Sequence, residues 1–156
     1  MDDARLGGTR FLLCRAASSV CALPLAQVLE VLRPLPLRPV PSAPPFLCGL
    51  SVVRGDPIPV ADLARILGQE APVPLRRWVA LRLGKRRLAL AVEAVIGLRD
   101  LEAAAFQSLP PLLRGANPGL VEAIGSLDSE LLVALEAGRT LPENLWETLA
   151  GEGACP

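Results

Sequence analysis

The amino-acid sequence predicts a mainly β protein, built from two small β barrels that pack side by side and carry short helices, one of them C-terminal. Three observations support this fold class. The chain repeats a pair of apolar segments, its short apolar segments are separated by turn signals, and its connections are rich in proline. A unit of about 65 residues buries only about 60% of the surface of its unfolded chain, so the two barrels should share an interface.

The internal repeat predicts that the two units are similar. Phe11–Leu32 aligns without a gap with Trp78–Arg99, at an offset of 67 positions. Each copy reads as an apolar strand, a polar turn, a second apolar strand and an apolar continuation. The turns at Ala16–Ser19 and Gly84–Arg87 suit short hairpin loops. Although any two β hairpins share part of this pattern, the repeat favours two units with pseudo-two-fold similarity.

A shorter echo and three linkers complete the strand pattern. Gly55–Leu63 resembles Asp128–Glu136, and both look like a turn followed by a strand. Arg33–Pro45 holds six prolines, so it should be extended or turn-like, and only an edge strand tolerates such a segment. We expect Gly68–Leu75 to be the junction between the units and Ser108–Gly119 to be the long loop of the second unit.

Helix signals occur at two places. Asp62 is suited to cap a short helix that ends near Gly68. Thr140 and Glu143 form a T-x-x-E capping box, and Gly151 is expected to stop the helix that follows. An apolar stripe on that helix should dock on a barrel, and it consists of Leu141, Leu145 and Leu149 with Trp146 beside them. Asp100–Phe106 is a candidate for a further helical turn.

These signals give one domain over residues 1–156. The first unit should span about residues 10–70, the second about 75–138, and the C-terminal helix 141–150. The segment 1–10 is acidic and polar, unlike a signal peptide. The chain has no run of about 18 uncharged apolar residues, so we expect no membrane span and a cytoplasmic location.

Composition narrows the class of function. Hydrophobic residues make up 51% of the 156 residues, which is ample for a buried core and too rich for disorder. Lys plus Arg and Asp plus Glu balance at 16 each, and aromatic residues make up only 3%. Both the positive charge and the stacking surfaces of a nucleic-acid-binding protein are therefore missing. The absence of histidine excludes histidine-based triads, general bases and zinc sites.

The remaining reactive side chains form no catalytic or metal-binding pattern. No two of the four cysteines make a C-x-x-C pair, and we expect Cys14, Cys21 and Cys48 to be small buried hydrophobic residues. Three carboxylates have local explanations: Asp62 as a cap, Asp128 as a turn residue and Glu93 as an exposed charge on a strand. The sequence therefore predicts no enzyme, no metal and no cofactor.

The run Arg54-Gly55-Asp56 separates two apolar segments. It reads most simply as a hairpin turn, in which Gly55 supplies the unusual backbone angles and the two charged residues are exposed. Pro57 and Pro59 then bias the following strand to a sheet edge. The same tripeptide binds integrins in secreted proteins, but nothing in this sequence indicates secretion.

A second interpretation of Arg54 depends on Glu30. Glu30 is the lone carboxylate in a strand of valine and leucine, and an unpaired buried charge is costly, so a cationic partner is expected. Arg54 is the candidate partner if the two strands are neighbours. An exposed pair of this kind adds little stability, and its use would be to set the geometry and charge of a binding face.

These residues belong to an ordered set of motifs that resembles the CheW family of chemotaxis coupling proteins. The set comprises V-L-E-V at Val28–Val31, P-P-F-L-C-G at Pro44–Gly49 and R-G-x-x-x-P-V-x-D-L at Arg54–Leu63. The segment Val79–Leu98 is similar to the family's second hairpin, and the likeness covers roughly residues 10 to 150. The resemblance implies two five-stranded SH3-like barrels and a non-enzymatic scaffold. It implies two partners, the cytoplasmic tip of a methyl-accepting chemoreceptor and the regulatory domain of a CheA-type histidine kinase.

The resemblance also implies a partner-binding site. Glu30 and Arg54 would be the charged pair of the binding face, and Val28 would be an apolar contact for the receptor's helix hairpin. The loop beside them would be Gly55, Asp56 and Pro57. The protein would be recruited to receptor clusters, with no insertion into the membrane.

The chain departs from the family pattern beside Arg54. Val52 stands where the family usually has Asn, and Asp56 stands where an apolar residue is common. These departures leave open a paralogue that binds the receptor but not the kinase, or one that serves another pathway such as surface motility. A further alternative is a small-molecule sensor that uses a groove between the two units.

Overall fold

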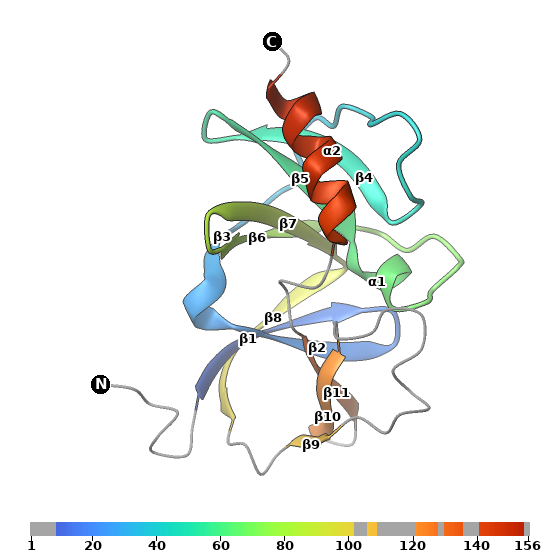
Figure 1. The fold of residues 1–156 in the computed structure, drawn as a ribbon. Coiled ribbons are helices and arrows are strands. Elements are labelled where there is room, and N and C mark those ends of the chain that lie inside the picture. The colour runs from blue at the N-terminus through green and yellow to red at the C-terminus, as the bar shows by residue number, and fades with distance from the viewer. Residues whose placement is uncertain (1–8, 102–105, 109–120, 128–129, 136–140, 155–156) are drawn as a thin grey trace.

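Two β-sheets, one above the other in Figure 1, form the body of the molecule. The structure is a computed structural model and describes residues 9–101, 106–108, 121–127, 130–135 and 141–154. Sheet I holds β1 (Thr9–Ala16), β2 (Ser19–Pro24), β8 (Ala94–Leu101), β9 (Phe106–Ser108), β10 (Val121–Leu127) and β11 (Glu130–Leu135). Sheet II holds β3 (Val28–Leu32), β4 (Leu47–Val53), β5 (Asp56–Asp62), β6 (Arg77–Leu83) and β7 (Arg86–Val92). The mainly β fold is confirmed, and the short strand β9 adds a sixth strand to one sheet.

The two hairpins that the repeat predicts are present in equivalent registers. In the β1–β2 hairpin Leu13 lies opposite Ala22, and in the β6–β7 hairpin Ala80 lies opposite Ala89, which is the same offset of 67 positions. The shorter echo also corresponds to equivalent strands, because β5 runs parallel to β7 and β11 runs parallel to β2. The pseudo-two-fold symmetry therefore relates the two hairpins to each other, and it also relates the two parallel strand pairings.

The two sheets exchange edge strands, while the expected unit bounds of about 10–70 and 75–138 stay predictions. The strand order is β8-β1-β2-β11-β10-β9 in sheet I and β3-β6-β7-β5-β4 in sheet II. The β1–β2 hairpin thus pairs with β8, which follows the β6–β7 hairpin in the chain. The β6–β7 hairpin pairs with β3, which follows the β1–β2 hairpin. The 3₁₀ turn η2 (Leu25–Gln27) carries the chain from β2 into sheet II, and a bend at Glu93, whose N–H bonds Arg15 O at 3.0 Å, carries it back to sheet I.

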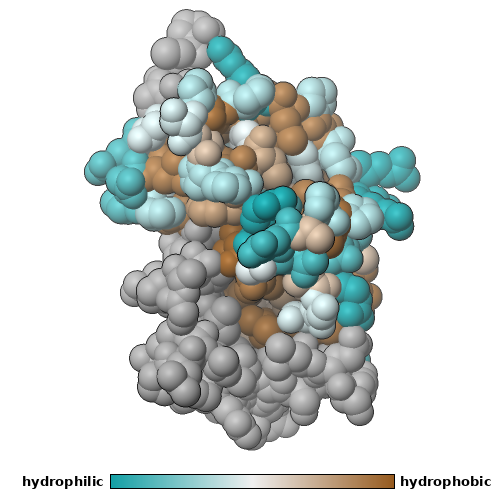
Figure 2. Space-filling view, turned by 90° about the vertical axis from the view of Figure 1, so that its right-hand side faces the viewer, coloured by the Kyte–Doolittle hydropathy of each residue, from teal (hydrophilic) through white to brown (hydrophobic). Residues whose placement is uncertain are grey.

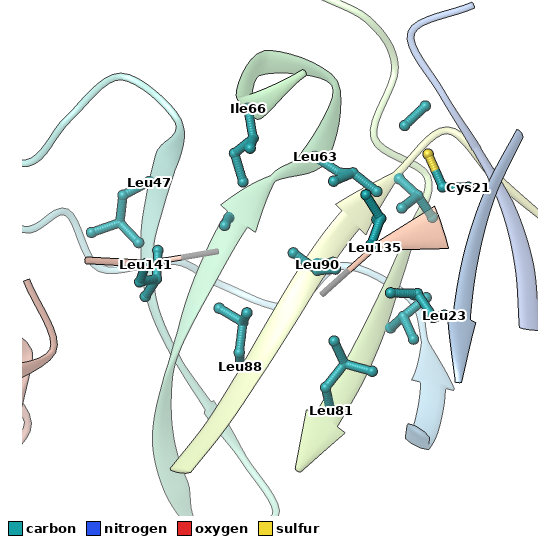
Figure 3. Packing of buried hydrophobic residues seen from close by; sticks show 14 of the residues in the cluster. Cys21, Leu23, Leu47, Leu63, Ile66, Leu81, Leu88, Leu90, Leu135 and Leu141 are labelled. Atoms are coloured by element: carbon teal, nitrogen blue, oxygen red, sulfur yellow. The ribbon is translucent and has the colours of Figure 1, made fainter. Parts of the chain in front are cut away.

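The main core lies between the two sheets, as expected for units that share an interface. Because successive strand residues point to opposite faces, Leu81, Leu88 and Leu90 of sheet II face Cys21 and Leu23 of sheet I (Figure 3). Each sheet also carries one smaller apolar cluster on the face that points away from the main core. The one on sheet I includes Leu13, Val20 and Ala22, and the one on sheet II includes Val53, Ile58, Trp78, Ala89 and Ala91.

The expected helices are present with changed limits. Asp62 caps α1 (Leu63–Ile66), since its Oδ1 accepts the Arg65 N–H at 3.2 Å. The C-terminal helix α2 is Glu143–Ala154, so Gly151 does not stop it; glycine weakens a helix by about 1 kcal/mol and does not forbid it. The expected stripe is buried and joins the main core with Leu141, Leu145, Trp146 and Leu149. Thr140, the proposed cap, lies outside the described residues.

Two strand expectations need correction. Asp100 and Leu101 extend β8 along β1, and Phe106 begins β9, so the described ends of Asp100–Phe106 are strand rather than helix. The prolines of β5 do not make it an edge strand, because β4 and β7 flank it. Pro57 and Pro59 are tolerated because β5 pairs with β7 only from Val60 onward. The six-proline segment has no helix, as expected, and touches β4 through an isolated bridge.

Candidate functional site

Arg54 lies in an unusual backbone conformation. It and Gly55 are the two loop residues of the β4–β5 hairpin, and their φ angles are +53° and +86°. Positive φ at both positions is typical of a type I′ turn, where Asn, Asp or Gly is preferred at the first position. A long side chain rarely adopts this region, and such outliers cluster at functional sites. The turn therefore holds Arg54 outward at some expense of local stability.

Arg54 and Glu30 form the pair that the sequence predicts. Arg54 Nε donates to Glu30 Oε2 and Arg54 Nη2 donates to Glu30 Oε1, both at 2.8 Å. β3 and β4 are not hydrogen-bonded neighbours, since they are the two opposite edges of sheet II. The bidentate contact therefore joins the two edges where the sheet curls into a barrel. Arg54 keeps 75% of its side chain exposed, against 27% for Glu30, so the arginine remains available to a partner.

The electrostatics of the pair keep both side chains charged. The hydrogen bond from Arg54 holds the pKa of the Glu30 carboxyl below its ordinary value. The same bond raises the pKa of the Arg54 guanidinium. At neutral pH the pair therefore presents a fixed, oriented dipole at the surface.

A second ion pair lies beside the first. Arg87 Nη1, on β7, donates to Asp56 Oδ2 at 2.7 Å, and both side chains are partly exposed. This contact spans the point where β5 and β7 diverge and have no backbone pairing. Gly55 and Pro57, the other predicted loop residues, are exposed on either side of Asp56. The β4–β5 hairpin tip is thus tied to β3 by one ion pair and to β7 by another.

Exposed apolar side chains flank Glu30 along β3 and precede Arg54 on β4, and sequence analysis missed most of them. Leu29 and Val31 are 43% and 41% exposed, and Val52 is 64% exposed. Val28, the predicted apolar contact, is half-buried and packs against the main core. Alternation along β3 would have indicated this, because residues on either side of Glu30 point away from its face. Val52, a departure from the family pattern, therefore lies at the surface.

Two hollows border the Asp56–Arg87 pair. One, of about 410 Å³, lies between this pair and Glu30–Arg54. The other, of about 690 Å³, lies between β5, the start of β7 and helix α2. There Arg86 donates two hydrogen bonds to Glu143 and stacks 5.0 Å from the ring centre of Trp146. The tips of the β4–β5 and β6–β7 hairpins lie on the left in Figure 1, on the side away from the viewer in Figure 2.

The face toward the viewer in Figure 2 offers no comparable feature among the residues coloured there, where polar and apolar side chains interleave. Within the described ranges, no group of three or more Cys, Asp or Glu side chains could hold a metal ion. Among those same residues, no helix is long and apolar enough to cross a membrane. The charged pair with its exposed apolar neighbours is therefore the best candidate site.

Comparison with known proteins decides the family. The model of the CheW-like domain matches residues 10–144. The chain belongs to the CheW-like domain family. A curated relative, protein FrzA of Myxococcus xanthus, is 33% identical over 126 residues, which cover 76% of this chain and 78% of that protein. The chemotaxis protein CheW of Rhizobium meliloti is 22% identical over 138 residues, covering 87% of this chain and 89% of that protein.

The fold agrees with this family. The crystal structure of the scaffolding protein TtCheW from Thermoanaerobacter tengcongensis superposes with a TM-score of 0.71 at 22% sequence identity. The match covers 82% of this chain and 88% of that chain. The CheW-like fold class inferred from the sequence motifs is thereby confirmed.

Proposed function

We propose that this protein is a non-enzymatic adaptor that couples chemoreceptors to a CheA-type histidine kinase in a chemosensory array. Its family is that of CheW-like domains, and relatives are named as a chemotaxis protein and a scaffolding protein. The single observation that carries the proposal is the bidentate Glu30–Arg54 pair, presented by a turn in a disfavoured conformation. Such a feature serves recognition better than stability, because an exposed ion pair contributes little to folding.

The chemistry of the face suits a helical protein partner. Leu29 and Val31 on β3 and Val52 on β4 supply exposed apolar surface near the charged pair. An amphipathic helix of the receptor tip would lay its apolar side on such a surface and place a carboxylate beside Arg54. Val28 is half-buried against the main core, and its expected role as an apolar contact for the receptor helix stays a prediction.

The adaptor proposal is preferred to the alternative of a small-molecule sensor. The family match and the relatives named as a chemotaxis protein and a scaffolding protein favour the adaptor. A cytoplasmic location, next to the receptor clusters, follows from the proposed partners. No catalytic role is assigned to any residue of the face.

A binding experiment with two baits tests the function. The purified protein is titrated with a chemoreceptor signalling-tip fragment and, separately, with the CheW-like regulatory domain of the kinase, both from the same organism. We expect binding to both, and a loss of at least about tenfold in affinity for Arg54→Glu. The matched control is Arg10→Glu, which breaks another exposed pair, Arg10–Asp100 at 2.9 Å, on sheet I.

Each result has a distinct meaning. Normal binding by Arg54→Glu would show that the site is assigned to the wrong face. Binding to the receptor alone would identify a paralogue without kinase coupling, and would direct attention to Val52 and Asp56. Binding to neither bait would remove the adaptor function and leave the fold as it stands.

A further inference from the structure

The two copies of the repeat differ at the positions that line the smaller hollow. In the β1–β2 hairpin, Leu13 and Val20 are buried in the apolar cluster of sheet I. The equivalent positions in the β6–β7 hairpin, at the offset of 67, are Ala80 and Arg87. A leucine is thus replaced by a much smaller side chain, and a buried valine by an arginine that turns outward to Asp56.

The edge strands differ in a matching way. Gly97 on β8 lies opposite Leu13, whereas Glu30 on β3 lies opposite Ala80. In sheet I Leu13 is buried opposite Gly97. In sheet II the carboxylate of Glu30 projects to the rim, and nothing replaces the leucine. Among the described residues, the positions in sheet I therefore hold a buried leucine and valine, whereas the equivalent positions in sheet II line the hollow of about 410 Å³.

The hollow has an apolar floor and a charged rim. Its floor is formed by Leu29, Val53, Ile58 and Ala80, and its rim by the Glu30–Arg54 and Asp56–Arg87 pairs. A pocket with apolar walls and a polar rim is the kind of site that accepts an anchor side chain at a protein interface. Cores normally close such spaces, since close packing is worth several kcal/mol, so an open one beside a candidate docking face is suited to binding.

The unused hydrogen-bonding groups on the rim define the partner's charge. Arg54 spends Nε and Nη2 on Glu30, and Arg87 spends Nη1 on Asp56, which leaves Arg54 Nη1 and Arg87 Nε and Nη2 as spare donors. Both carboxylates of the rim are already paired. Arg82 lies directly opposite Arg87 in the β6–β7 ladder but does not line the hollow. The rim is therefore complementary to a negatively charged group.

We propose that this hollow receives one bulky apolar side chain of a protein partner, carried on a segment with a carboxylate next to it, and that Arg87 is a specificity-determining residue which binds that carboxylate. The inference deepens the proposed adaptor function and rests on it. Asp56 acts as a positioning residue, because its bond to Nη1 orients the guanidinium over the hollow. The equivalent positions of sheet I, Leu13 and Val20, are buried in an apolar cluster instead.

The test places residues of the β1–β2 hairpin at the equivalent positions of the β6–β7 hairpin. Ala80→Leu fills the hollow, Arg87→Val removes the spare donors, and the double variant combines both. The matched control is Arg82→Val, the same change at the neighbouring arginine, which does not line the hollow. Each variant is titrated with whichever bait, receptor tip or kinase regulatory domain, binds the wild-type chain, and its melting temperature is recorded.

The expected result is a loss of at least about tenfold in affinity for Ala80→Leu and for Arg87→Val, with Arg82→Val within about twofold of wild type. Ala80 is buried and lies opposite Glu30 rather than a glycine, so the melting temperature of Ala80→Leu decides whether its binding can be interpreted. If Ala80→Leu unfolds, the Arg87→Val variant at the partly exposed Arg87 decides by itself. The slope of affinity against salt concentration should also become shallower for Arg87→Val, which a purely structural role would not produce.

The outcomes separate this inference from the proposed function. If wild type binds a bait and Arg87→Val binds equally well, the hollow is not an anchor site while the adaptor function stands. An equal loss in Arg82→Val would show that only general positive charge matters, which overturns the assignment to Arg87. If wild type binds neither bait, both proposals fall.

Discussion

Gly49→Ala is expected to destabilise the fold far more than Gly97→Ala, although the two glycines have nearly the same backbone. Their φ angles are +144° and +151°, on β4 and β8 respectively. A Cβ atom on Gly49 would lie 2.5 Å from the carbonyl oxygen of Arg38, whereas one on Gly97 would have nothing within 4 Å. The pair of variants therefore separates a backbone clash from the strain that both share.

The size of the difference follows from the contacts. Strain in this region costs an L-residue about 1–2 kcal/mol in either variant. At Gly49 the clash also displaces Arg38, whose N–H and C=O bond to Leu50 at 2.7 and 2.8 Å. Losing both bonds adds about 2 kcal/mol. We therefore expect a loss of about 3–4 kcal/mol for Gly49→Ala and about 1–2 kcal/mol for Gly97→Ala.

Thermal and urea unfolding, followed by circular dichroism, measure this difference. A change of 1 kcal/mol moves the melting temperature of a protein of this size by about 2–4 °C. Gly49→Ala should then melt about 6–16 °C below wild type, and Gly97→Ala about 2–8 °C below it. Equal losses in the two variants would refute the reasoning. They would mean that the proline-rich segment does not depend on its close approach to β4.

Three further predictions concern charge and burial. Arg54→Asn should keep or raise the melting temperature, because Asn suits the first position of the turn, yet it should lose partner binding; a parallel fall in both would contradict a binding role. Arg86→Ala should speed amide hydrogen exchange in α2 while the helix stays docked through its leucines, and unchanged exchange would show that the contact with Glu143 and Trp146 holds nothing. Burial raises the pKa of Cys21 to about 12 and raises that of Cys14, so the folded chain keeps both thiols protonated while the unfolded chain ionises near pH 9. Stability should therefore fall as pH rises from about 9 toward 12, less steeply in Cys21→Ala, and equal slopes would contradict the burial.

The hairpins could be predicted from sequence because the residues that determine each hairpin are close together in the chain. Alternating apolar residues and a two-residue turn fix which residues face each other, and the offset of 67 positions carries the register of one hairpin onto the other. Cys14 and Cys21 were likewise expected to be buried, and both are fully so, while Cys48 is only half-buried.

The exchange of edge strands could not be predicted in this way. β3 and β8 occupy equivalent places in the repeat, with Leu29 matching Ile96 and Val31 matching Leu98, so their patterns fit either hairpin equally well. The choice depends on where η2 and the bend at Glu93 direct the chain. That direction depends on tertiary packing, which a local pattern does not report.

The candidate site was predicted in part. Glu30 is a lone carboxylate among apolar residues, which predicted Arg54 as its partner, and the structure contains this ion pair. The partner of Asp56 was missed, because Asp56 was explained as a turn residue and Arg87 belongs to another hairpin. The roles expected for Val28, Gly55, Asp56 and Pro57 in partner binding stay predictions, as does the division of labour between receptor and kinase.

The repeat also explains how a nearly symmetric fold can offer one binding site. Two equivalent mouths would bind two equivalent partners, whereas an adaptor must distinguish its partners. The chain removes the symmetry with few substitutions, since Leu13 and Gly97 on one side correspond to Ala80 and Glu30 on the other. In the first pair the leucine is buried, whereas in the second both residues line the hollow and the carboxylate charges its rim. Because these residues lie at strand positions whose registers are fixed, the sheets stay the same while the surfaces that they present diverge.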